Sequence, residues 1–177
     1  MPERPTNPGA PDEDTYQPSR RRERSTTWAW IGNELIDPGG VVVARVSADV
    51  IHCGQERILV ESTPGIMGFR ARGTTVAGEV FSATHQHLTI TKVDASCGER
   101  NYRLLRDSPW RKARTLYAGD EPIARVRPLI SGRVEVLDIP GAAEIPLSDF
   151  VFLTWVCVLI DSPVRRPVAA GPRRWGQ

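Results

Sequence analysis

The middle of the chain alternates apolar and polar residues with a period of two rather than 3.6. The segments 88–93 and 102–105 show this alternation, which is typical of half-buried strands. Turn-forming residues separate such segments at intervals of about 8–12 residues, and no helical pattern intervenes. We expect about ten to twelve short strands in a mainly-β sandwich or barrel. The predicted strands cover 27–31, 41–46, 58–61, 66–72, 76–83, 88–93, 102–105, 110–117, 123–127 and 134–137.

One segment near the C-terminus breaks the alternation. Phe150–Ile160 is 11 residues long without a charge, between Asp149 and Asp161. Its β-branched residues favour a strand, but its length favours a helix, because buried strands usually run about 4–8 residues. We predict a helix over Ser148–Ile160, with Ser148 or Asp149 as its N-cap. A helix that is apolar all round must be enclosed, and only the strands can enclose it. The expected core side chains are Phe150, Phe152, Leu153, Trp155 and Leu159.

The same segment indicates whether the chain crosses a membrane. A bilayer-spanning helix needs about 20 apolar residues, and acidic residues at both ends disfavour insertion. We therefore expect no transmembrane segment, and a short membrane anchor is the less favoured alternative. Residues 1–27 contain no apolar stretch, so no signal peptide is expected. The three cysteines follow no pattern, which indicates a reduced, cytoplasmic protein.

Composition divides the chain into three parts. Residues 1–27 and 162–177 are rich in proline and charged residues, so they bury too little apolar surface to order themselves. We expect them to be disordered tails, the second one basic. Between them, residues 28–161 form the single predicted domain.

Positive charge gathers in one part of that domain. The net charge of the chain is +2, yet residues 100–133 hold nine Lys or Arg and three Asp or Glu. Segments 110–117 and 123–127 are expected to pair, and residues two apart on a strand share a face. The predicted basic stripe suits phosphate groups; the alternative is a charged edge that prevents strand-to-strand aggregation. The candidate residues for an anionic head group are Arg111, Lys112, Arg114, Arg125 and Arg127.

Motifs for catalysis or cofactor binding do not emerge. The chain has no Gly-x-Ser-x-Gly elbow, no Walker A loop and no Gly-x-Gly-x-x-Gly fingerprint. His85 and His87 share a face if extended, and with His52, Cys53 or Cys97 they could hold zinc. The simpler interpretation is a pair of polar residues beside a turn. We predict no catalytic residue, metal or cofactor.

The number and order of the strands, the final segment 149–161 and the basic hairpin of 110–114 and 123–126 resemble the tubby C-terminal-like superfamily. This group includes tubby domains, phospholipid scramblases and LURP-one-related proteins. The resemblance covers residues 28–161 and implies a closed antiparallel barrel around a hydrophobic C-terminal helix. The chain lacks the cysteine-rich palmitoylation cluster and the clear calcium loop of the scramblases, so the resemblance does not imply calcium-driven lipid scrambling.

The resemblance also implies a function, because tubby domains bind phosphoinositide head groups through basic residues. We expect a non-enzymatic binding module that recognises anionic phospholipid head groups or a protein partner, in the cytoplasm or peripherally at a membrane. Nucleic acid is not an expected partner. The alternative is a small-ligand carrier or an enzyme with a pocket inside the barrel, although the predicted helix would fill that interior.

Overall fold

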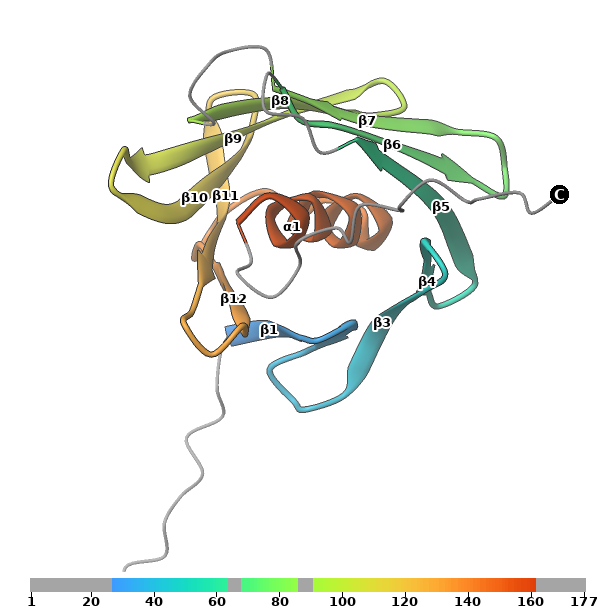
Figure 1. The fold of residues 1–177 in the computed structure, drawn as a ribbon, viewed down its shortest axis with the longest axis horizontal. Coiled ribbons are helices and arrows are strands. Elements are labelled where there is room, and N and C mark those ends of the chain that lie inside the picture. Colours follow the sequence, from blue (N-terminus) through green and yellow to red (C-terminus); the bar gives the residue numbers. More distant parts are fainter. Residues whose placement is uncertain (1–26, 64–67, 86–90, 162–177) are drawn as a thin grey trace, which may run out of the picture.

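A computed structural model describes residues 27–63, 68–85 and 91–161 of the 177-residue chain. In this part of the chain, twelve strands form a closed barrel, and a single helix, α1 (Leu147–Asp161), lies inside the ring of strands (Figure 1). The strands are β1 (Thr27–Ile31), β2 (Glu34–Ile36), β3 (Val42–Ser47), β4 (Val50–Cys53), β5 (Glu56–Thr63), β6 (Arg70–Thr75), β7 (Val80–Thr84), β8 (Lys92–Cys97), β9 (Arg100–Ser108), β10 (Arg111–Ala118), β11 (Glu121–Pro128) and β12 (Val134–Asp138).

Every strand pairs antiparallel with the next one along the chain, and β1 closes the barrel against β12. The predicted antiparallel barrel around one helix is therefore confirmed. The predicted hairpin is also present, because Arg114 of β10 lies opposite Val126 of β11. Two short strands, β2 and β4, were not predicted, and β8 coincides with the predicted strand 88–93 only at Lys92 and Val93. Thr27, which was both the last residue of the predicted tail and the first of the predicted strand 27–31, pairs with Leu137 as the first residue of β1.

Helix α1 begins one residue before the predicted start and ends one residue after the predicted end. Ser148 and Asp149 consequently lie in its first turn, so the prediction that either is the N-cap was wrong. The Phe150 amide donates to the Pro146 carbonyl at 3.0 Å, which is the first hydrogen bond of the helix. Its acceptor precedes both Ser148 and Asp149, so the helix begins before either residue. Asp149 still suits this position, because a carboxylate in the first turn complements the positive end of the helix dipole.

The helix occupies space that a barrel of this size cannot fill with strand side chains alone. Eight strands enclose an interior that side chains fill, whereas about 16–18 leave a channel. Twelve strands fall between, and an α-helix is about 10–12 Å wide with its side chains. Small inward residues make further room: Ala71, Ala83 and Ala95 lie opposite one another across β6, β7 and β8. Beside them, Gly73 has no side chain where a Cβ would lie 3.0 Å from the Phe152 ring.

Aromatic contacts join the helix to the wall. The rings of Trp30 and Trp155 pack with centroids 4.8 Å apart, and the Trp30 indole N–H donates to the Thr154 hydroxyl at 3.0 Å. This contact satisfies the indole and the hydroxyl inside the core, where an unpaired polar group is costly. Of the expected helix core residues, Leu159 is partly buried against the core and four are buried: Phe150, Phe152, Leu153 and Trp155.

The barrel has two ends, and the helix runs from one to the other. Because consecutive strands are antiparallel, alternate turns lie at the same end. Turns 98–99 and 119–120 and the connection 139–146 lie at the end where α1 begins, here named the Asp149 end. Turns 109–110 and 129–133 lie where α1 ends, here named the Asp161 end.

Several predictions fall outside the described residues. They are the disorder of residues 1–26 and 162–177, the strand character of residues 66–67 and 88–90, and the position of His87.

Candidate functional site

The basic segment 100–133 divides between the inside and the outside of the barrel. On β9, the side chains of Arg100, Tyr102 and Arg106 reach the helix carboxylates. Arg114 of β10 does the same from the neighbouring strand. Three of the nine cations counted in the sequence therefore pair with the helix carboxylates, which lowers the charge available to a surface patch, although the Arg100 side chain is 40% exposed.

Asp149, at the start of α1, is fully buried and takes hydrogen bonds from two β9 side chains. The Arg100 guanidinium donates through Nε at 2.6 Å and through Nη2 at 2.9 Å, and the Tyr102 hydroxyl donates at 2.7 Å. Burial, followed by the hydrogen bond to Asp149, raises the pKa of Tyr102 well above its ordinary value. The hydrogen bond to Asp149 likewise raises the pKa of Arg100. These bidentate, charge-assisted contacts fix the helix start against the wall.

Asp161, the last residue of α1, is held by three cations. It pairs with Arg114, and the side chains of both residues are 1% exposed. Arg106 donates to the same carboxylate at 2.8 Å, and the Lys112 ammonium lies 3.3 Å from the Asp161 carbonyl oxygen. A negative charge at a helix C-terminus opposes the helix dipole, so these cations offset an unfavourable position. Arg114, a predicted head-group residue, is therefore buried and committed to the helix.

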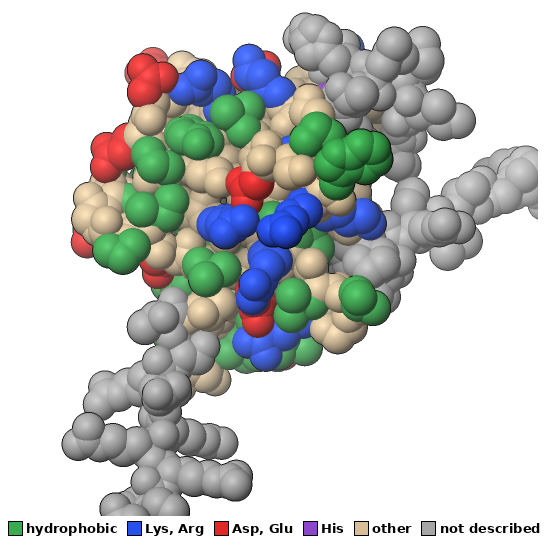
Figure 2. All heavy atoms as spheres, turned by 90° about the vertical axis from the view of Figure 1, so that its left-hand side faces the viewer, with side chains coloured by type: hydrophobic (Ala, Val, Ile, Leu, Met, Phe, Trp, Pro, Cys, Tyr) green, Lys and Arg blue, Asp and Glu red, His purple; other side chains and the backbone are tan. Residues whose placement is uncertain are grey.

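The other predicted head-group residues remain on the outside. Arg125 and Arg127 share the outer face of β11, and each pairs with a carboxylate: Arg125 with Asp107 at 2.6 Å, and Arg127 with Glu135 at 2.5 Å. Figure 2, which views the side of the barrel formed by β9–β12, shows Lys and Arg side chains gathered in a stripe with acidic side chains among them. The outer basic face comprises six described cations and three carboxylates, an excess of three positive charges: Arg103, Arg111, Lys112, Arg125, Arg127 and Arg133, with Asp107, Asp120 and Glu135.

The outer basic face reaches the Asp161 end next to two exposed apolar side chains. Trp110, in the turn between β9 and β10, is 94% exposed, and Ile130, between β11 and β12, is 102% exposed. These hairpins are neighbours in the barrel, about 10 Å apart at a strand spacing of about 4.8 Å. Arg111 and Lys112 directly follow Trp110, and Arg133 closes the second turn. We call these five residues the rim cluster. Sequence reasoning placed Trp110 at the start of the predicted strand 110–117 and did not single out Ile130; both lie in turns, where an apolar side chain has nothing to pack against.

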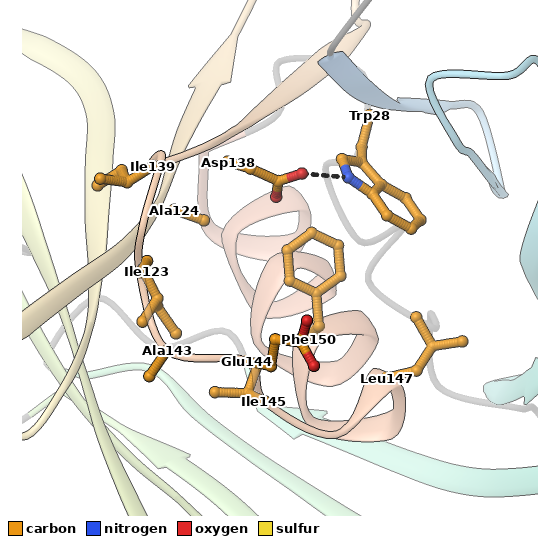
Figure 3. A pocket seen from close by; sticks show the side chains of 11 residues that line it. Trp28, Ile123, Ala124, Asp138, Ile139, Ala143, Glu144, Ile145, Leu147 and Phe150 are labelled. Atoms are coloured by element: carbon orange, nitrogen blue, oxygen red, sulfur yellow. Dashed lines mark hydrogen bonds between the residues drawn. The ribbon is translucent and has the colours of Figure 1, made fainter.

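A cavity lies at the opposite, Asp149 end of the barrel, between β1, β11, the start of α1 and the connection 139–146. Its volume is about 370 Å3, and its lining is mostly apolar (Figure 3). Phe150 of α1 and Ile123 and Ala124 of β11 belong both to the core and to this lining, so the cavity lies at the mouth of the barrel, whose interior α1 occupies. No local pattern in the chain indicated this cavity.

The cysteines and histidines do not form a site in the described part of the chain. Cys53, Cys97 and Cys157 are buried and unpaired with one another. Burial raises the pKa of the Cys157 thiol to about 12 and that of the Cys97 thiol further, which keeps both protonated and unreactive. His85 is 4% exposed. Within residues 27–63, 68–85 and 91–161, no group of three or more His, Cys, Asp or Glu side chains is placed to hold a metal ion.

Comparison of the chain with known protein families, with curated proteins and with solved structures gives no match. Among the described residues, no helix combines the length and the apolar character that crossing a membrane requires.

Proposed function

We propose that this protein is a non-enzymatic module, akin to the tubby-like superfamily, that binds the anionic phospholipid surface of a membrane from the cytoplasm. The rim cluster makes the first contact, and the outer basic face behind it adds attraction. The observation that carries the proposal is the pairing of two fully exposed apolar side chains with three cations on neighbouring turns.

Charge supports this proposal. Arg125 and Arg127 each have a carboxylate partner, whereas Arg111 has no ion-pair partner among the described residues. Lys112 contacts a backbone carbonyl oxygen, and Arg133 lies 3.9 Å from Glu135. The positive charge at the Asp161 end is therefore less neutralised than the charge along the middle of β11. A basic side chain near an anionic membrane contributes about 1 kcal/mol, so the three rim cations contribute about 3 kcal/mol.

The apolar side chains support a membrane rather than a dissolved anion. Tryptophan favours the boundary between lipid head groups and acyl chains. Burying an exposed Ile or Trp side chain contributes about 1.5–3 kcal/mol each. A soluble inositol phosphate or a phosphopeptide would use the cations but gain little from an exposed Ile130. Two apolar tips and three cations suit reversible, peripheral attachment, which needs more than one signal.

Vesicle co-sedimentation of the full chain tests the proposal. We expect binding to phosphatidylcholine vesicles that contain phosphatidylserine, little binding to phosphatidylcholine alone, and loss of binding between about 0.1 M and about 1 M salt as the charges are screened. Absence of binding to anionic vesicles at the lower salt concentration would overturn the membrane proposal and favour a protein partner.

Matched variants locate the contact. Arg111→Glu with Lys112→Gln should weaken binding at least tenfold, because the two changes cancel the positive charge of the rim cluster. Arg57→Glu with Arg72→Gln makes the same change on exposed positions of β5 and β6 and should have little effect.

The apolar contribution has its own pair of variants. Ile130→Ser should weaken vesicle binding, whereas Val76→Ser, in an exposed turn at the opposite end, should not. Equal effects of the two serine variants would show that the rim is not the contact.

A further inference from the structure

The cavity at the Asp149 end is a second candidate site, independent of the rim cluster. It lies where β1 and β11 meet the connection that leads into α1, and its volume of about 370 Å3 falls within the range of about 300–1,000 Å3 typical of small-molecule sites. Figure 3 shows the ring of Phe150 at its centre, with Trp28 and Asp138 on one side and Ile123 and Ile139 on another.

The walls of the cavity are held in place without a ligand. The connection 139–146 is tied to β11 by two hydrogen bonds, from the Ile139 amide to the Ile123 carbonyl at 3.2 Å and from the Ala143 amide to the Glu121 carboxylate at 3.0 Å. The Trp28 and Phe150 rings pack with centroids 5.2 Å apart. Binding to a pre-formed site loses no free energy to the ordering of its walls.

The polar groups of the cavity are acidic. Asp138 and Glu144 line it, and no Lys, Arg or His does so among the described residues. One Asp138 oxygen accepts the Trp28 indole N–H at 2.8 Å, and the other oxygen has no hydrogen-bond partner among the described residues (Figure 3). An anionic ligand would be repelled by both carboxylates. A cation would be attracted by them and by the faces of the two rings.

The start of α1 also lies at this cavity, and a helix N-terminus by itself favours an anion. Asp149, a buried carboxylate in the first turn, already complements the positive end of the helix dipole. Asp138 and Glu144 then make the lining of the cavity negative.

We propose that this cavity binds a small apolar molecule that carries one protonated amine. The apolar body lies against Trp28, Phe150 and Ile123, and the ammonium group lies against the carboxylate of Asp138, while Glu144 adds negative charge to the lining. The ammonium donates to the second Asp138 oxygen, so the existing hydrogen bond to Trp28 is kept.

Three probes of equal chain length test the proposal with the full chain: octylamine, octanol and octanoate. Binding is followed through the NMR shifts of the Trp28 indole N–H and of the backbone amides of 139–147. We expect all three perturbations to map to the cavity, with octylamine binding about fivefold tighter than octanol, the gain of one partly exposed ion pair. Octanoate should bind most weakly. Equal affinity for the three probes, tightest binding of octanoate, or no shift at these residues would each overturn the proposal.

Two double variants test whether Asp138 and Glu144 cause the tighter binding of octylamine than of octanol. Asp138→Asn with Glu144→Gln keeps an acceptor for Trp28 and should reduce the preference for octylamine over octanol to about one. Glu99→Gln with Asp120→Asn removes two exposed carboxylates from the same end of the barrel, outside the cavity lining, and should leave the preference unchanged. If the two double variants behave alike, the preference comes from the general charge of this end and the proposal fails.

Discussion

Replacing Asp161 by Asn should destabilise the protein strongly, because the change leaves a buried cation without its carboxylate. Arg114 is 1% exposed and pairs directly with Asp161, so it cannot turn to solvent when the charge is removed. Removing one partner of a buried ion pair costs about 3–5 kcal/mol. Relief of the unfavourable charge at the helix C-terminus returns about 0.3–1 kcal/mol. The expected net loss is about 2–4 kcal/mol, a large part of the roughly 5–15 kcal/mol that stabilises a typical domain.

Urea unfolding followed by tryptophan fluorescence measures this loss, because Trp30 and Trp155 pack against each other in the core. With a urea dependence of about 2 kcal/mol/M, the midpoint should fall by about 1–2 M. The matched control is Asp120→Asn, which removes a fully exposed carboxylate paired with Arg103 and should cost less than about 1 kcal/mol.

A double variant distinguishes an unpaired buried charge from a general loss of packing. Arg114→Met combined with Asp161→Asn removes both buried charges, and such replacements are often close to neutral. Arg106, 20% exposed, can then extend toward solvent. We expect the double variant to be at least about 1 kcal/mol more stable than the sum of the two single effects implies. Additive effects, or a single Asp161→Asn loss below about 1 kcal/mol, would refute the reasoning.

Three further predictions concern the enclosed helix and the core around it. Leu153→Asp should abolish folding because it places an unpaired charge in a fully buried position, whereas Leu59→Asp, at a side chain that is 48% exposed, should leave soluble folded protein by circular dichroism. Gly73→Ala should lower the free energy of unfolding by about 1–3 kcal/mol, since its Cβ would lie 2.9–3.2 Å from three buried neighbours; an unchanged urea midpoint would show that the neighbouring side chains can move to accommodate the methyl group. Burial raises the pKa of the Cys97 and Cys157 thiols above 9.0. The protonated thiols therefore contribute fully to the free energy of unfolding below about pH 9, and the contribution falls above it, by about 1.4 kcal/mol per thiol at pH 10. In urea unfolding, Cys97→Ala with Cys157→Ala should flatten this fall, and an equally steep fall would exclude the thiols as its cause.

The sequence contained enough information for most of the strands but not for two of them. The missed strand β4 follows a turn at Ala48 and Asp49, which have φ angles of 48° and 63°. Tight hairpin turns with positive φ usually carry Asn or Gly, so this pair gave no turn signal. The strand β2 is only three residues long, which is too short to show an alternation.

The candidate site was predicted only in part, because the sequence shows which residues are charged but not which charges meet. Arg114 and Arg125 occupy neighbouring strands and looked equivalent. In the folded chain, Arg114 faces the helix and Arg125 faces Asp107 on the outside. Trp110 and Ile130 became a cluster only because neighbouring hairpins bring residues 20 positions apart to one rim.

The sequence by itself determined that the chain forms short antiparallel strands and that its uncharged segment must be enclosed. Both follow from local pattern: alternation sets one face of each strand inward, and a helix without a polar face cannot lie on a surface. Only the tertiary structure decided the use of the flanking charges. Asp149 and Asp161 lie about 18 Å apart along α1, and Arg100 and Arg106 lie about 20 Å apart along β9. This match of length lets one strand bind both ends of the helix, and it depends on a pairing between residues about 50 positions apart that no local pattern contains.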